Sequence, residues 1–86
     1  MQSVWKYSVS LVDSFKLALP KDSEILSLQT QCGLPYVWAL VTLGNEKETR
    51  KFRLAGTGNL IEENIKKFIG TFQLDGELVF HLFEIE

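Results

Sequence analysis

The chain has 86 residues, 45% of them hydrophobic, which predicts one small globular domain over residues 1–86 and argues against a disordered chain. A net charge of −2 argues against general nucleic-acid binding, and a single cysteine with a single histidine excludes an intrachain disulfide and a His/Cys zinc site. No apolar run is long enough for a membrane helix or a signal peptide, and the unpaired thiol suits a reducing compartment, so we expect a cytosolic protein.

Alternation of apolar and polar residues predicts two β-strands at the start of the chain, around residues 4–11 and 15–19. Pro20 ends the second strand because proline cannot donate a hydrogen bond to a neighbouring strand. One face of these two strands carries the apolar side chains Trp5, Tyr7, Val9, Leu11, Phe15, Leu17 and Leu19.

The segments 24–31 and 36–43 predict two further strands, joined by a tight turn in which Gly33 can adopt a positive φ. The face expected in the core carries Leu26, Leu28, Val37, Ala39 and Val41. The opposite face carries Ser27, Gln29, Gln31, Tyr36, Trp38 and Leu40. Aromatic side chains beside glutamines are common in binding surfaces, because they combine large contact area with hydrogen bonding.

The stretch "RKFRLAGTGN", residues 50–59, predicts a basic strand that ends in a glycine turn, with Lys51 and Arg53 pointing outward. Its G-T-G segment lacks the spacing of a dinucleotide fingerprint and the lysine of a P-loop, so a plain turn is favoured. An anion site stays open as the alternative, because basic residues flank the turn and backbone N–H groups in such loops can bind anions. Asn59 could cap a helical turn, so we expect at most one short turn of helix near 59–66.

The C-terminal segment predicts a hairpin in which Asp75 and Gly76 form a two-residue type I′ turn. In that register the core face carries Phe68, Phe72, Val79, Phe83 and Ile85. The opposite face is apolar too and carries Ile69, Leu78, Phe80 and Leu82. Since one sheet layer in a small domain buries one face, the second face needs a cover, which is the second sheet of a sandwich, a helix or another copy of the chain. We favour another copy for part of it, so these four residues are the expected interface of a homo-oligomer.

The sequence offers no constellation typical of an enzyme. His81 lies in the middle of a strand and is more typical of a packed side chain than of a catalytic base. Cys32 lies in a turn without a nearby histidine, and the pair Glu62–Glu63 suits a helix start. We therefore expect no catalytic residues, no metal and no cofactor. The fold class predicted is all-β, a six- to seven-stranded antiparallel sandwich or open barrel.

Several segments resemble a family of small uncharacterised domains encoded in bacteriophage and prophage genomes. The matching stretches are "LALPKDSEILSLQ", "VWALV", "FRLAGTGN", "FIGTFQLDG" and "LVFHLFE", which together cover nearly the whole chain. Asn59 departs from the pattern, in which histidine often follows G-T-G. The resemblance implies a phage accessory protein in the cytoplasm of the bacterial host, and the family is of unknown function.

That resemblance leads to three functional hypotheses. In the first, an oligomer antagonises host defence by sequestering a nucleotide-derived immune signal between its protomers. The residues expected to bind this ligand are Arg50, Lys51, Arg53, Gly56, Thr57, Gly58, Asn59, Tyr36 and Trp38. In the second, the chain inhibits a defence effector, of CRISPR or another system, by direct protein–protein binding through the Gln/Tyr/Trp face or the acidic C-terminal strand. In the third, it is a virion or regulatory component.

Overall fold

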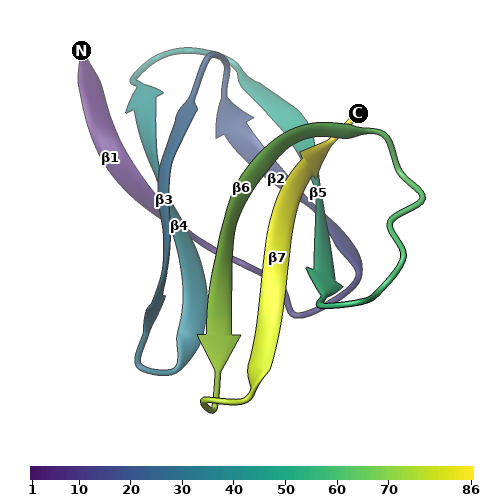
Figure 1. Cartoon of the computed structure of the whole chain (residues 1–86). Helices are drawn as coiled ribbons and strands as arrows, with labels where there is room; N and C mark the ends of the chain where they lie inside the picture. Colours follow the sequence, from purple (N-terminus) through teal and green to yellow (C-terminus); the bar gives the residue numbers. More distant parts are fainter.

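The computed structural model describes all residues from Met1 to Glu86, and they form seven β-strands without a helix. The strands are β1 (Gln2–Ser8), β2 (Ser14–Pro20), β3 (Glu24–Gln31), β4 (Leu34–Thr42), β5 (Lys47–Gly56), β6 (Ile65–Leu74) and β7 (Leu78–Ile85). They build two antiparallel sheets (Figure 1): sheet A in the order β1-β4-β3 and sheet B in the order β2-β5-β7-β6. The structure contains no helix that is long and apolar enough to cross a membrane.

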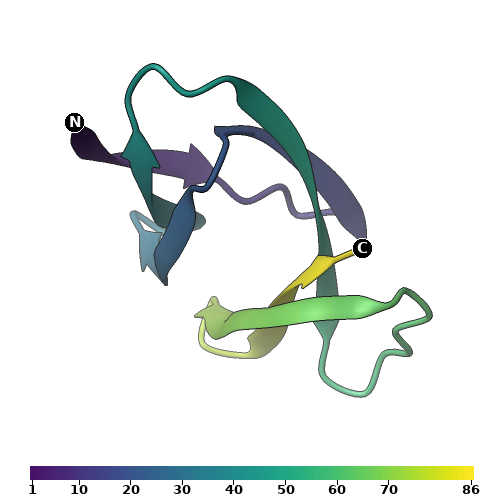
Figure 2. The same ribbon diagram turned by 90° about the horizontal axis from the view of Figure 1, so that it is seen from above.

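The two sheets pack face to face around one hydrophobic core, in agreement with the all-β sandwich predicted from alternation. Phe52, Leu19 and Leu82 from sheet B and Val37 from sheet A are among its most deeply buried side chains. The view in Figure 2 shows that the sheets are not closed into a barrel. The arrangement is consistent with a sandwich, and the segment between β5 and β6 contains no helical turn.

Strands β3 and β6 bring the two sheets together along one side of the sandwich. Gly70 of β6 faces inward there, and a Cβ atom at this position would lie 3.2 Å from Cδ2 of Leu28 on β3. Because glycine leaves that space free, the leucine side chain can pack directly over the β6 backbone.

The strand faces predicted for β2, β4 and β5 are confirmed. Leu19, Val37 and Phe52 have no exposed surface, whereas the outward Lys16 and Lys51 are exposed. The predicted turn before β4 is also confirmed, since Cys32 and Gly33 have φ values of 52° and 78°.

The prediction that Leu26 lies in the core is wrong. A β-bulge in β3 shifts the register between Ile25 and Ser27, so that Ile25 packs against the core and Leu26 is 47% exposed. A bulge inserts one residue on one strand only, which reverses the faces on one side of it. The alternation in the sequence carries no mark of this insertion.

The hairpin register predicted for β6 and β7 is also wrong by one residue. Asp75 and Gly76 have the positive φ values of a type I′ turn, 53° and 72°, and the amide of Glu77 donates to the carbonyl of Leu74. Glu77 itself, however, is not paired, and the ladder begins with Leu74 opposite Leu78. The extra residue places Phe72 opposite Phe80 instead of Val79.

This register corrects the proposed interface. Phe80 and Leu82 face inward with Phe72, and Leu82 is only 1% exposed, so it is a core residue and is not available to a second subunit. Ile69, the extra residue of a second bulge, also packs against the core. Leu78 alone of the four expected interface residues is exposed, at 53%.

Candidate functional site

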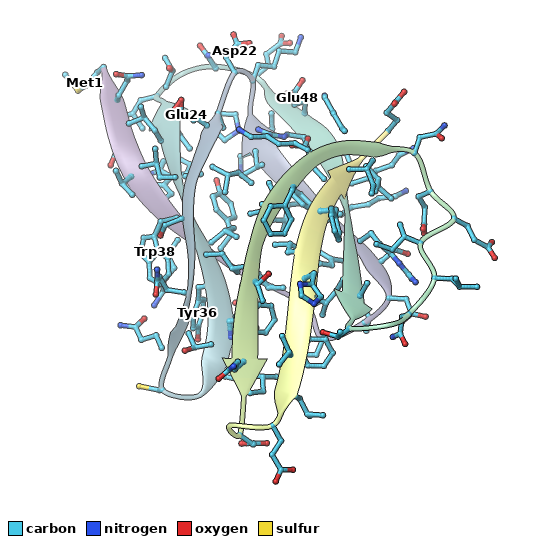
Figure 3. The ribbon with its side chains drawn as sticks, in the orientation of Figure 1. Met1, Asp22, Glu24, Tyr36, Trp38 and Glu48 are labelled. Atoms are coloured by element: carbon cyan, nitrogen blue, oxygen red, sulfur yellow. The ribbon has the colours of Figure 1, made fainter.

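The outer face of sheet A presents a pair of aromatic side chains from its central strand. Because Val37, Ala39 and Val41 of β4 are directed into the core, Tyr36 and Trp38 lie on the opposite side of the strand, where both are half-buried. Their ring centroids are 6.1 Å apart, with the ring planes inclined by 59°. Figure 3 shows both side chains on the side of sheet A that is turned away from sheet B.

Strands β1 and β3 surround this aromatic pair with long polar side chains. The register places Lys6 of β1 opposite Trp38, and Gln29 of β3 opposite Tyr36. The Lys6 ammonium lies 4.5 Å from the centroid of the Tyr36 ring and donates a hydrogen bond of 2.9 Å to Oε1 of Gln31. We call these five residues (Lys6, Gln29, Gln31, Tyr36 and Trp38) the aromatic–amide face.

The G-T-G segment forms a turn that satisfies its own backbone. The amide of Asn59 donates to the carbonyl of Gly56 at 3.0 Å, and the amide of Thr57 donates to the carbonyl of Val79 at 3.4 Å. Gly58 has a φ of 90°, which favours glycine at this position. Two of the amides expected to bind an anion are therefore already engaged within the chain.

His81 connects this turn to β6. Its Nε2 lies 2.8 Å from the hydroxyl of Thr57, and its Nδ1 lies 2.9 Å from the hydroxyl of Thr71. A neutral imidazole donates from one nitrogen and accepts at the other, which matches two hydroxyl partners. Both ring nitrogens are thus occupied by structural contacts on the outer face of sheet B.

Arg53 lies under the loop between β5 and β6, and its guanidinium is surrounded by acceptors of the chain. It donates to the carbonyl of Leu60 at 2.9 Å and to the carbonyl of Asp13 at 3.4 Å. Carboxylate oxygens of Glu63 and Asp13 lie at 3.6 and 3.9 Å. The side chain is only 14% exposed, so this cation helps to hold the loop on the sheet.

Arg50 has a different environment, on the inner side of sheet B near the β2–β3 connection. Its guanidinium forms a two-pronged ion pair with Glu84 of β7, with N–O distances of 2.8 and 2.7 Å, and donates to the carbonyl of Ser23 at 2.6 Å. The hydrogen bonds from Arg50 hold the pKa of Glu84 below its ordinary value, and the same bonds raise the pKa of Arg50. The pair joins two strands of sheet B to the connection that leads into sheet A.

The residues predicted to form one ligand site are distributed over three places. Tyr36 and Trp38 lie on the outer face of sheet A, Lys51 and Arg53 on the outer face of sheet B, and Arg50 on the inner side of sheet B. Within one chain none of these three predicted cations lies beside the aromatic rings, where the neighbouring cation is Lys6. A site shared between protomers stays a prediction.

A shallow hollow of about 540 Å³ lies beside the G-T-G turn. It is lined by Gly56, Thr57, Asn59, Glu77, Leu78, Val79 and Phe80. The one charged side chain in this lining is an acid, which would repel a phosphate. The hollow joins the predicted ligand loop to two predicted interface residues, Leu78 and Phe80, but its charge does not suit the predicted ligand.

Sequence reasoning missed two features of these surfaces. Alternation places Lys6 on the polar face of the first strand, but its position beside Tyr36 depends on the pairing of β1 with β4, which are far apart in the chain. Glu84 belongs to the acidic C-terminal strand, but its side chain is 4% exposed and paired with Arg50. The one sign of this burial in the sequence is the alternation of strand faces, which places Glu84 on the same side of the strand as Phe80 and Leu82.

No curated protein and no solved structure matches the chain. The structure brings together no group of three or more His, Cys, Asp or Glu side chains that could hold a metal ion. The family model described as Domain of unknown function (DUF7352) matches residues 1–86, from one end of the sequence to the other, and the chain therefore belongs to that family.

Proposed function

We propose that the chain is a non-catalytic protein-binding domain and that the aromatic–amide face of sheet A is its binding surface. The observation that carries the proposal is the position of Tyr36 and Trp38, side by side at the centre of a sheet face that no other part of the chain covers. Tryptophan and tyrosine at the centre of an exposed surface are the residues that dominate binding energy in protein interfaces.

The surrounding side chains define the chemistry of the partner. Gln29 and Gln31 offer amide donors and acceptors, and Lys6 offers one cation, while Glu24, opposite Leu40 at the start of β3, is the one acid of these strands on the same outer face. A complementary protein surface would place an apolar side chain over Trp38, polar groups on the glutamines and a carboxylate near Lys6. In the phage setting that the sequence resemblance implies, such a partner would be a defence protein of the host.

Sequestration of a nucleotide-derived signal has less support from the same geometry. Arg50 is paired with Glu84, and Arg53 is held by carbonyl and carboxylate oxygens of the chain. Lys51 is free, but it lies on the other sheet from the aromatic pair. A nucleotide on the aromatic pair would therefore find one cation, Lys6, and none of the three basic residues of β5.

Site-specific photo-crosslinking in bacterial cells tests the proposal. A photoreactive amino acid at Gln29, on the aromatic–amide face, should form a discrete adduct with one protein, whereas the same group at Lys16, on the outer face of sheet B, should not. Trp38→Ala should abolish the adduct, because a central tryptophan contributes ~2 kcal/mol or more, about thirtyfold in affinity. Phe68→Ala, which removes an exposed aromatic side chain from the other sheet, is the matched control.

An adduct that survives Trp38→Ala, or one that forms equally from Lys16, would contradict this assignment of the surface. Binding of the purified chain to cyclic dinucleotides or cyclic ADP-ribose isomers, detected as a thermal shift that Arg53→Ala removes, would favour the sequestration hypothesis instead.

A further inference from the structure

Strand β1 is an edge of sheet A, and its free side borders the molecule in Figure 1. The other three edge strands contain features that interrupt pairing: β2 ends in Pro20, and β3 and β6 contain bulges. By contrast, β1 keeps an unbroken register of seven residue pairs with β4 and contains neither a proline nor a bulge. A regular edge without proline or bulge is a template for another strand, and Lys6 is the one charged side chain on it.

The hydrogen bonds at the two ends of β1 determine which backbone groups this edge presents. The amide of Val9 donates to the carbonyl of Pro35, and the amide of Leu43 donates to the carbonyl of Met1. In the register of β1 with β4, the two residues of each bond lie directly opposite each other. Since bonded and non-bonded pairs alternate in an antiparallel ladder, the odd-numbered residues of β1 bond to β4. The N–H and carbonyl groups of Gln2, Val4, Lys6 and Ser8 therefore point to the free side.

These four residues are symmetric about Trp5, which suits pairing between identical strands. We propose that β1 pairs antiparallel with β1 of a second copy, around a twofold axis at Trp5, so that Val4 lies opposite the partner's Lys6. In this register all four free residues find partners, and sheet A continues as one sheet across the two copies. This proposal is independent of the proposed function, since it depends on the backbone of β1.

Side chains favour this register over the one centred on Lys6. Lys6 is the only charged residue of β1, and a shift of the axis to Lys6 would place the two lysines opposite each other. With the axis at Trp5, each lysine lies opposite a valine on the outer face. Trp5 is 38% exposed, and its counterpart in the second copy would cover it as a close, non-hydrogen-bonded cross-strand pair.

The pairing would also enlarge the aromatic–amide face. Lys6 lies opposite Trp38 within the chain, and the partner's Val4 would lie on the far side of that lysine. The two faces would then meet along the twofold axis and form one continuous surface.

A charge exchange at Val4 tests the register by sedimentation equilibrium. Val4 is 51% exposed, so the variants leave the core unchanged. Val4→Glu should lower the dimer Kd several-fold by pairing with the partner's Lys6, whereas Val4→Lys should raise it about tenfold through two like-charge pairs. Combining Val4→Lys with Lys6→Glu should restore dimerisation. Ser27→Lys, on the outer face of β3, is the matched control and should leave Kd unchanged.

Amide hydrogen exchange provides the second readout. The amides of Val4 and Lys6 should be protected at concentrations where the dimer forms and exchange rapidly in the monomer, while those of Trp5 and Tyr7 stay protected in both. A wild-type chain that is monomeric up to the millimolar range would overturn the proposal. A dimer in which Val4→Glu weakens association, or in which the Val4 and Lys6 amides exchange rapidly, would overturn it as well.

Discussion

Arg50, Lys51 and Arg53 follow one another on a single strand, yet each has a different role because of its position. Lys51 faces solvent, Arg53 lies under the β5–β6 loop, and Arg50 reaches Glu84 on the inner side of the sheet. The Arg50–Glu84 pair is the most enclosed of the ion pairs, with side chains 16% and 4% exposed. Its strength depends on burial and two-pronged geometry, which reduce competition from water.

The ion pair makes stability dependent on acid pH. The pKa of Glu84 is lower in the folded chain than its ordinary value of 4.5, mainly because of the hydrogen bonds from Arg50. The pair therefore contributes fully above that value, and the contribution is lost as pH falls through the folded-state pKa. Glu84→Gln should lower the free energy of unfolding by about 3 kcal/mol at pH 7.

Urea unfolding of both chains between neutral and strongly acidic pH measures this dependence. The difference between wild type and Glu84→Gln should shrink toward zero in acid, because the wild-type carboxylate is then protonated too. Glu86→Gln, an exposed carboxylate two residues further along, should have little effect at any pH. A difference that stays constant over the whole pH range would argue against the ion pair as its source.

At the level of elements, the β6–β7 hairpin shows how one residue changes the faces of two strands. The turn residues Asp75 and Gly76 have the backbone conformation that their types favour, but Glu77 is added without a partner. With a second bulge between Phe68 and Gly70, Phe72 faces the core and Phe68 faces solvent. The hairpin therefore has one apolar inner face, and the loop that Arg53 holds lies on the outer face of its sheet.

Gly76 has a positive φ of 72°, so a substitution that adds a side chain at this position should destabilise the turn. Gly76→Ala should destabilise the chain by about 1–2 kcal/mol, because L-residues are disfavoured in the left-handed region. Glu77→Ala, at the next position and without a positive φ, should change stability by less than about 0.5 kcal/mol. Thermal unfolding followed by circular dichroism measures both, and equal effects of the two substitutions would contradict this account of the turn.

At the level of the whole molecule, the two sheets come closest along β3 and β6, where Leu28 packs over Gly70. The small size of the domain makes such contacts valuable, because a chain of this length buries only ~60–65% of its unfolded surface. The fit between a leucine and a glycine fixes how closely the edges of the sheets approach.

A double-mutant cycle tests this contact. Gly70→Val should destabilise the sandwich by about 1–3 kcal/mol through overpacking, and Leu28→Ala by about 2–3 kcal/mol through a cavity. The double variant should be more stable than the sum of the two losses predicts, by about 1 kcal/mol, since valine fills part of the space that leucine leaves. Additive losses in chemical denaturation would mean that the two side chains do not share this space.

The sequence by itself determined the all-β class, the strand positions and most strand faces, because alternation, proline and glycine act through local backbone geometry. It also identified Tyr36, Trp38, Gln29 and Gln31 as one surface, since β3 and β4 are joined by a short turn. The tertiary structure decided where bulges fall, that Lys6 joins this surface, and that Arg50 binds Glu84. These outcomes depend on pairing between distant strands and on packing between the sheets, which local pattern does not record.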